Sequence, residues 1–472
     1  MTARAHFRCA SLALVGLVCG CAHFDPQPLS AQQTLAAFER RTLADPGLKA
    51  FMAANHEVAP AHGGRWGLKA LTLVAFYDQP ALSEARARLL AVQAARITAA
   101  ERPNPSISLA PGYDRGVPDV PSPWIVPVTL DWPIETAGKR GDRIAQARHA
   151  AAAARWDLVG IVWRVRSRVR SALLDLYAAR RRAALLASGV STLRRVVVLL
   201  EGQLRAGSVS SYEVAQARVS LDDSVLAKQA AAGEARQAKV ALAGALGVPL
   251  RALAGVRFSF DDLEALPGDL TRPQIRRQAL LERADVRSAL ERYAASQSAL
   301  ALEVARQWPD IDLGPGYAWN PQLAGDSEWQ LGLTVSLPLL NQNQGPIAEA
   351  RARRKAAAAH FLAVQAAAIT QIDGALAAYR SALSRASTAS LLLVDLTRRL
   401  AYTRARVEAG ELQPLDLSDA QVVFDTGEQS RLDAQVEAEQ SLGRLEDAVQ
   451  SPLSLSPLAL RAAQQRISRE SP

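Results

Sequence analysis

The strongest constraint on how this chain folds is an internal repeat. Residues 205–217 read RAGSVSSYEVAQA and residues 408–420 read EAGELQPLDLSDA, so that Gly207 and Gly410 stand 203 positions apart. Nearly the same offset continues upstream in three further pairs: Tyr113 with Tyr317, Pro133 with Pro338, and Arg148 with Arg351. Each half therefore predicts the same order of elements, which is two short strands, a long helix, a glycine turn and a second helix.

Composition narrows the class of protein. At 472 residues the chain exceeds a typical single domain, and the repeat makes it one architecture of two units. Charged residues are 21% and apolar residues 49%, which excludes a disordered chain and a helical membrane protein. The net charge of +9 would suit nucleic acid or anionic lipid, but arginine is spread along the helical segments and forms no single patch. No nucleic-acid partner is therefore expected.

The N-terminus has the pattern of a secretory signal peptide, which we place at residues 1–20. Arg4 and Arg8 come before an apolar stretch, Ala10–Val18, that is too short to span a bilayer. A small residue followed by Cys21 resembles a bacterial lipobox, which implies acylation of Cys21 and sorting to the outer membrane. Cleavage nearby without lipidation is the alternative. A mature chain would keep only Cys21, so no disulfide framework is expected.

Long helices dominate both halves. Residues 139–205 contain no proline, and apolar residues recur there at alternating spacings of three and four. This seven-residue period predicts coiled-coil packing, and a helix of 67 residues would reach on the order of 100 Å. A looser copy covers 347–407. The other predictions are return helices at 212–246 and 415–449, shorter helices at 82–101 and 273–306, and irregular structure at 25–79 and 247–273.

Each long helix is predicted to end at its glycine. Gly207 and Gly410 suit the position just after a helix, where the backbone turns left-handed. Ser210 with Glu213 reads as a capping box for the next helix, and Pro414 suits a first helical turn. Both motifs are therefore expected to be the tips of helical hairpins.

Four short segments are rich in β-forming residues: 106–113, 124–132, 310–319 and 329–337. Five of the eight tryptophans stand at the ends of these segments: Trp124, Trp132, Trp308, Trp319 and Trp329. Aromatic residues at strand ends are typical of a β-barrel at a membrane interface. The alternative is a soluble sheet with tryptophan in its core. Four strands cannot close a barrel, and open edges are not tolerated in lipid, so a membrane role requires an oligomer.

The whole layout resembles the TolC family of outer-membrane efflux and secretion channels over about residues 75–450. The Asn104–Pro105 entry to the first strand, the two tip motifs and the repeat carry this resemblance. It implies a fold that is mainly α with a small β part. In it a homotrimer builds a twelve-stranded transmembrane β-barrel, four strands per chain, and a long α-helical coiled-coil barrel. It also implies a passive duct whose tips meet a periplasmic adaptor (membrane fusion) protein, which leads to an inner-membrane pump of the RND type, while the barrel sits in outer-membrane lipid.

The repeat and the resemblance together divide the chain into six parts. They are the signal peptide 1–20; an irregular, lipid-anchored segment 21–79; a first repeat 80–247 with strands in 106–132 and a tip at 205–212; a linker 248–272; a second repeat 273–450 with strands in 310–337 and a tip at 408–415; and a tail 451–472.

The resemblance also assigns a gate. Acidic residues six and nine positions after the second tip glycine narrow the family's periplasmic end, and these positions hold Asp416 and Asp419, with Glu213 as a first-half counterpart. Rings of carboxylates favour cations. The plainer interpretation is that these acids only favour helix starts. The expected adaptor-contacting tip residues are Gly207, Ser208, Val209, Gly410, Glu411 and Leu412. Leu412 departs from the family's best-known member, which has an arginine there that ties the closed aperture.

One further motif indicates a branch of the family. Residues 135–140, ETAGKR, look like the Glu-Thr-Gly/Ala-Gly-Lys-Arg sequence that follows the second strand in heavy-metal cation efflux proteins. The glycine spacing of a phosphate-binding loop is absent. Small molecules or metal cations are thus the expected cargo.

No catalytic constellation stands out, so an enzyme is not expected. The six histidines show no spacing typical of a metal site, and we expect neither a bound metal nor a cofactor. Two alternatives to an efflux duct stay open from the sequence. One is a lipid-anchored periplasmic coiled-coil adaptor that does not conduct, and the other is a duct for type I protein secretion.

Overall fold

The computed structural model describes residues 23–61, 63–113, 124–263, 266–268, 277, 279–319 and 327–453. The chain divides into two compact units, Met1–Thr42 and Leu43–Pro472. The described part of the first unit contains one helix, α2 (Ala31–Arg40), which begins where the Ser30 side chain accepts a hydrogen bond from the Gln33 N–H. The predicted signal peptide and Cys21 lie outside the described residues, as does the tail from residue 454.

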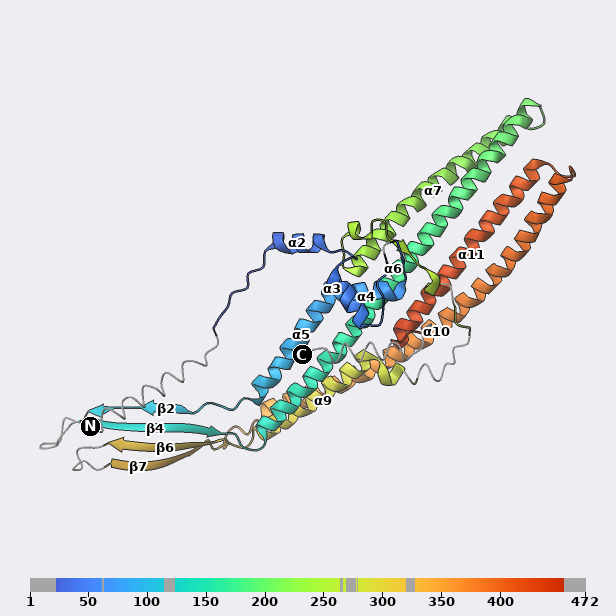
Figure 1. Cartoon of the computed structure of the whole chain (residues 1–472). Coiled ribbons are helices and arrows are strands. Elements are labelled where there is room, and N and C mark those ends of the chain that lie inside the picture. Colours follow the sequence, from blue (N-terminus) through green and yellow to red (C-terminus); the bar gives the residue numbers. More distant parts are fainter. Residues whose placement is uncertain are drawn as a thin grey trace. The chain divides into compact units, whose positions relative to one another are not determined.

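Two long helical hairpins form most of the second unit (Figure 1). The first joins α6 (Lys139–Arg205) to α7 (Ser211–Leu246), and the second joins α10 (Gln344–Glu408) to α11 (Pro414–Val449). The predicted bounds of α6 are confirmed, and α10 begins three residues earlier than predicted. Most of the heptad positions of α6 are buried, among them Val165, Val169, Leu176 and Val197.

Two shorter helices lead into the strands. They are α5 (Pro80–Ala100) and α9 (Ala284–Ala305), and both pack along α6. The prediction of one helix over 273–306 is wrong at Arg283, which is extended at φ −60° and ψ 131° and precedes α9. Its guanidinium explains the break, because it donates to the Ala448 carbonyl at 2.6 Å and pairs with Asp285 at 2.7 Å. Residues 273–276 and 278 of the predicted helix lie outside the described residues.

The main sheet is antiparallel in the order β2-β4-β6-β7 (Figure 1). Its strands are β2 (Ser106–Leu109), β4 (Trp124–Ile134), β6 (Ile311–Trp319) and β7 (Ser327–Val335), and the short β3 (Gly112–Tyr113) also pairs with β4. The predicted strand 106–113 is thus interrupted at Pro111, which has no N–H to donate. Among the described strands, β2 pairs only with β4 and β7 only with β6, so each has an unoccupied edge.

The prediction of irregular structure at 25–79 is wrong for much of that segment. It contains α3 (Pro46–Ala54), α4 (Leu68–Asp78) and a two-residue strand β1 (Arg65–Trp66), besides α2. The linker contains a two-residue strand, β5 (Arg257–Phe258), which follows the 3₁₀ turn η1 (Leu250–Leu253) and precedes the 3₁₀ turn η2 (Asp261–Leu263). Strand β1 pairs in parallel with β5. Helix α4 has apolar residues on all its sides, so it lacks an amphipathic period and suits a fully buried site.

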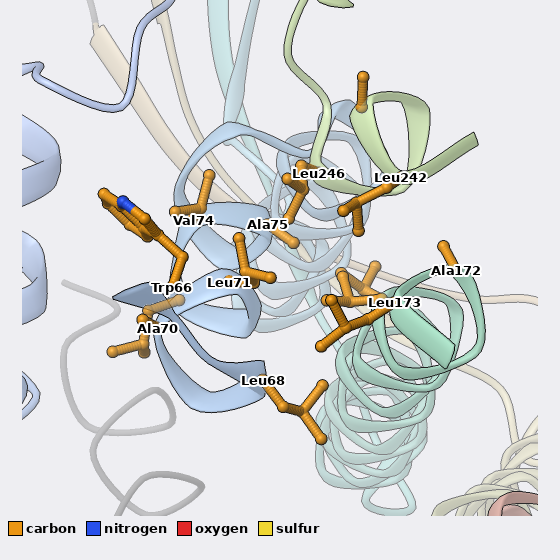
Figure 2. Packing of buried hydrophobic residues seen from close by; sticks show 14 of the residues in the cluster. Trp66, Leu68, Ala70, Leu71, Val74, Ala75, Ala172, Leu173, Leu242 and Leu246 are labelled. Atoms are coloured by element: carbon orange, nitrogen blue, oxygen red, sulfur yellow. The ribbon is translucent and has the colours of Figure 1, made fainter. Parts of the chain in front are cut away.

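The main apolar core surrounds α4. Leu71, Val74 and Ala75 of α4 are fully buried. Leu71 points toward Leu173 of α6, and Ala75 lies beside Leu246 of α7 (Figure 2). Residues far apart in the sequence thus fix the segment before the first repeat onto the base of the first hairpin. A second apolar cluster joins α10 to α11.

Candidate functional site

The sheet presents apolar side chains to its surroundings. On the edge strand β7, Trp329, Leu331 and Leu333 are 83%, 74% and 64% exposed, and alternation along a strand places them on one face. On the opposite edge strand, Ile107 and Leu109 are also exposed. A contiguous apolar surface of this kind is unfavourable in water and suits contact with lipid.

The two repeats build matching aromatic pairs in this sheet. Tyr113 lies across from Trp124 with ring centroids 5.0 Å apart, and Tyr317 lies across from Trp329 at 5.1 Å. Tyrosine and tryptophan combine an apolar ring with a polar tip, which suits them to a membrane interface. The repeat seen in the sequence is therefore also a repeat of contacts.

The motif at 135–140 forms a clamp where strand β4 turns into helix α6. Lys139 is buried, and its ammonium donates to the Trp308 carbonyl and to Asp310 Oδ1, each at 2.7 Å. The Thr136 N–H donates to the same Asp310 oxygen at 2.8 Å, and Arg143 pairs with Glu135. The motif therefore ties the strand-to-helix turn of the first repeat to the helix-to-strand turn of the second.

Both helix tips have the predicted glycine geometry. Gly207 and Gly410 have φ of +74° and +76°. At the first tip the Gly207 and Ser208 N–H groups donate to the carbonyls of Leu204 and Gln203, each at 2.9 Å, and the second tip repeats this pattern. These bonds satisfy the last carbonyls of each long helix while the chain reverses direction.

Two of the three predicted gate acids cap helices. Glu213 accepts hydrogen bonds from the Ser210 N–H at 2.6 Å and from its hydroxyl at 3.0 Å, which lowers the pKa of Glu213. Asp416 accepts from the Gln413 N–H at 2.8 Å. Both carboxylates thus have a local structural role, as the plainer interpretation of the sequence expected.

Asp419 differs from the other two acids. Partial burial, followed by the nearby charge of Asp416, raises the pKa of Asp419. The structure thus places two carboxylates of α11 within electrostatic range of each other. An approaching cation would relieve the repulsion between them.

The two tips contact each other within one chain. Gln203 Nε2 donates to Gln413 Oε1 at 3.1 Å, and Leu415 packs on a small cluster that contains Val196, Leu200 and Val214. Arg406 pairs with Glu411 at 2.8 Å within the second tip. Of the predicted adaptor-contacting residues, Gly207, Ser208, Gly410 and Glu411 are exposed, while Val209 and Leu412 are half-buried.

Comparison with known proteins identifies the family of this chain. The model of the outer membrane efflux proteins matches residues 75–248 and 275–449. The chain belongs to this family. This confirms the resemblance inferred from the repeat, and with it the mainly helical fold. The function is that of an outer-membrane channel of tripartite efflux pumps, which is a class of ducts and not of enzymes.

Individual relatives agree with this placement. The chain is 25% identical over 296 residues to the cobalt-zinc-cadmium resistance protein CzcC of Cupriavidus metallidurans, covering 62% of this chain and 69% of CzcC. A membrane protein from Pseudomonas aeruginosa has the same fold with a TM-score of 0.68 at 19% identity, over 81% of this chain and 92% of that one. The CmeC outer membrane channel of Campylobacter jejuni gives 0.65 at 16% identity, over 94% and 98%.

This outer membrane efflux protein also contains a buried ionic cluster between α6 and α11 that the sequence analysis missed. Arg170 donates to Glu439 Oε2 at 2.7 Å and to the Glu439 carbonyl at 2.9 Å, and Arg166 donates to Glu446 at 3.1 Å. These four residues are at most 5% exposed. A signal did exist, since charged residues at 166, 170, 439 and 446 interrupt helix faces that are otherwise apolar.

Burial dominates the electrostatics of this cluster. It raises the pKa of Glu439 to about 7, although the charge of Arg170 acts in the opposite direction. Burial also raises the pKa of Asp447, whose carboxylate accepts from Trp163 Nε1 at 2.9 Å and from the Ser167 hydroxyl at 2.6 Å. Carboxylates held this way keep protons more readily than exposed ones.

Proposed function

We propose that three copies of this outer membrane efflux protein form one passive duct. Its sheets would close into a transmembrane barrel, and its hairpins would form a periplasmic tunnel. The observation that carries the proposal is the pair of unoccupied edges at β2 and β7 on a sheet with exposed apolar side chains. In lipid every backbone polar group needs a partner, so each edge has to meet the edge of another copy.

The first hairpin has a matching unpartnered surface. Tyr212, Val219, Leu226 and Val240 of α7 are exposed and lie multiples of seven residues apart, which places them along one stripe. Within the chain α7 packs mainly on α6, with α4 and η1 at its base, and α10 packs on α9 and α11. A ring of copies would cover both flanks, with α7 of one copy next to α10 of the following one.

The low burial of both long helices, α6 and α10, also favours packing against neighbouring copies of the chain. In α6 and α10 the most apolar 18-residue windows are long and apolar enough for a membrane span, yet only 28% and 17% of their residues are buried within the chain. Both helices, at 67 and 65 residues, are far longer than the roughly 20 residues that cross a bilayer. Packing against neighbouring copies is the role that fits such helices.

We also propose that the tips form the gate and the docking site. Three copies of Asp416 and Asp419 would make two acidic rings, with Glu213 near them, and Asp419 is the acid that no capping bond involves among the described residues. The exposed tip residues would meet a periplasmic adaptor, which leads to an inner-membrane pump of the RND type. Carboxylate rings of this kind favour the passage of cations.

The proposed cargo is divalent heavy-metal cations. CzcC is named for resistance to cobalt, zinc and cadmium, and the motif at 135–140 of this chain resembles the heavy-metal branch. We further propose acylation of Cys21, which would anchor the chain to the outer membrane. The six-part division of the chain, with repeats at 80–247 and 273–450, belongs to the same proposal.

Single-channel conductance of the purified protein in a planar bilayer tests this function, with its oligomer mass measured in parallel. Cation-selective steps from a trimer are the expected result. A monomer without conductance would refute the duct and would favour a lipid-anchored adaptor. Growth of the host lacking this gene tests the cargo, since sensitivity should rise toward cobalt, zinc or cadmium and not toward uncharged drugs.

A further inference from the structure

The main sheet has an apolar face that ends where its strands join the helices. Alternate residues of a strand share a face, and so do cross-strand partners. Val335 therefore lies on the face that carries Trp329, and its partner Ile311 lies there too. The neighbouring pair, Asp312 with Thr334, lies on the opposite face. Ile311 and Val335 are thus the last pair on the face that suits lipid.

A groove of about 730 Å³ begins at this last pair and lies between the start of α6, the end of α9 and the sheet. We call it the junction groove, and its lining includes Asp142, Ala301, Val304, Trp308, Ile311 and Val335. Val304 and Trp308 are 40% and 64% exposed, so the groove offers an apolar surface to its surroundings. Its volume falls within the roughly 300–1,000 Å³ that is usual for small-molecule sites. The lipid-facing surface of the sheet therefore continues into a pocket between the helices.

The clamp around Lys139 holds the helical walls of the junction groove together. The Thr136 hydroxyl donates to the Pro309 carbonyl at 2.5 Å, and the Lys139 ammonium donates to the Trp308 carbonyl at 2.7 Å. These bonds join the start of α6 to the turn that follows α9. The groove is therefore preformed, and a ligand does not have to order its walls on binding.

Two polar groups in this apolar groove have no partner in the part of the chain that the structure describes. The Asp142 carboxylate is half-buried in the first turn of α6 and makes neither a hydrogen bond nor an ion pair there. The Trp308 indole N–H likewise has no acceptor, although the Trp308 carbonyl is held by Lys139. A carboxylate in apolar surroundings favours a cationic hydrogen-bond donor, and an indole N–H favours an oxygen acceptor.

These groups select the chemistry of the ligand. The apolar lining suits an acyl chain, because it continues the surface that faces lipid. The Asp142 carboxylate attracts a headgroup that has an ammonium and repels one with a net negative charge. In the proposed barrel a neighbouring copy meets the sheet at its edges, β2 and β7, whereas the groove continues the face of the sheet. Lipid is therefore a better occupant of this groove than a second copy of the chain.

We propose that the junction groove binds one phospholipid per chain, with a primary ammonium of the headgroup on Asp142, a headgroup oxygen at the Trp308 N–H and an acyl chain on the apolar lining. Phosphatidylethanolamine has such a headgroup. The proposal rests on the barrel proposed above, in which this end of the sheet lies at the periplasmic surface of the outer membrane. The lipid then comes from the inner leaflet of that membrane.

The test measures which lipid the full-length protein retains. Trimers are equilibrated in detergent with equal amounts of phosphatidylethanolamine and phosphatidylglycerol of the same acyl chains, then washed, and the retained lipids are quantified by mass spectrometry. We expect the wild type to prefer phosphatidylethanolamine about tenfold, because its ammonium forms a charge-assisted hydrogen bond. Asp142→Asn should reduce the preference to within about twofold of equality, and Asp142→Glu should keep most of it. The matched control is Glu101→Gln, an exposed acid at the end of α5 outside the groove, which should leave the preference unchanged.

A second variant keeps the test decisive if Asp142→Asn impairs folding. Ala301→Phe fills the groove from an exposed position of α9 and leaves Asp142 in place. It should lower the retained phosphatidylethanolamine about fivefold or more. Conducting wild-type trimers that retain both lipids equally, or an unchanged preference in intact Asp142→Asn or Ala301→Phe trimers, would overturn the lipid site while the duct stands. Failure of the wild type to form conducting trimers would instead remove the barrel and this inference together.

Discussion

Glu439 allows a quantitative test of the buried cluster through the substitution Glu439→Gln. Its side chain is 1% exposed, and burial is the main cause that raises its pKa from 4.5 to about 7. Charged and titratable groups near it come from three helices: Arg166 and Arg170 from α6, Glu446 and Asp447 from α11, and Tyr379 from α10. Glutamine keeps the shape and an oxygen for Arg170 but has no proton to titrate.

The sign and size of the effect follow from the pKa. Folded Glu439 holds a proton at pH values where the unfolded chain has lost it, so the folded state gains stability as the pH falls from about 7 to about 4.5. One pKa unit corresponds to about 1.4 kcal/mol, so the difference between 4.5 and about 7 contributes about 3.5 kcal/mol per chain at most. That contribution is lost as the pH rises through about 7.

Denaturant unfolding of both proteins at pH 8 and at pH 5 measures this contribution. Between these pH values the wild type should gain about 2.5 kcal/mol per chain more than the Glu439→Gln protein, because pH 5 still lies above the unfolded pKa. The raised pKa values of Asp447 and Asp425 act in both proteins and cancel in the comparison. Glu437→Gln, at an exposed position of the same helix, should behave like wild type. Equal pH dependence of the wild type and Glu439→Gln would refute the reasoning.

Three further predictions concern other parts of the molecule. Gly443→Ala should lower the free energy of unfolding, because its new Cβ would collide with a buried guanidinium, whereas Gly374→Ala, with open space around it, should add about 0.5–1 kcal/mol to the free energy of unfolding. Both are read from denaturant unfolding, and equal effects would contradict the packing. Reversing the charges of Asp416 and Asp419 to lysine should reduce cation selectivity and block by multivalent cations in single-channel recordings, and unchanged selectivity would exclude them from the aperture. Leu226→Asp on the exposed stripe of α7 should shift the oligomer mass from trimer to monomer, and an intact trimer would show that the stripe faces no neighbour.

The repeat, the long helices and the tips were predictable because their signals are local. Gly207 and Gly410 need only a helix on one side and a left-handed backbone, and the sequence around them shows both. The heptad pattern of α6 likewise depends on residues within two helical turns of each other. The bounds 139–205 could therefore be predicted from the local sequence alone.

The features that sequence reasoning missed depend on distant partners. Helix α4 was not predicted because a short, mostly apolar helix has no amphipathic period. Its burial against α6 and α7 explains this composition. The pair Arg170–Glu439 joins residues 269 positions apart, so neither residue looks buried from its own surroundings in the sequence. For the candidate gate, the spacing from the tip glycine located Asp416. It could not show that the Asp416 carboxylate accepts from the Gln413 N–H and so caps α11.

The clamp around Lys139 has a consequence for how the protein matures. A buried ammonium is unfavourable without its acceptors, and those acceptors are the Trp308 carbonyl and Asp310, which follow it by 169 and 171 residues. Because an exported chain emerges from its N-terminus, the first repeat has to wait in an unfinished state until the second one has crossed the inner membrane. The turn around Lys139 thus reaches its final contacts only with the second repeat, so the duplicated halves are not two independent folding units.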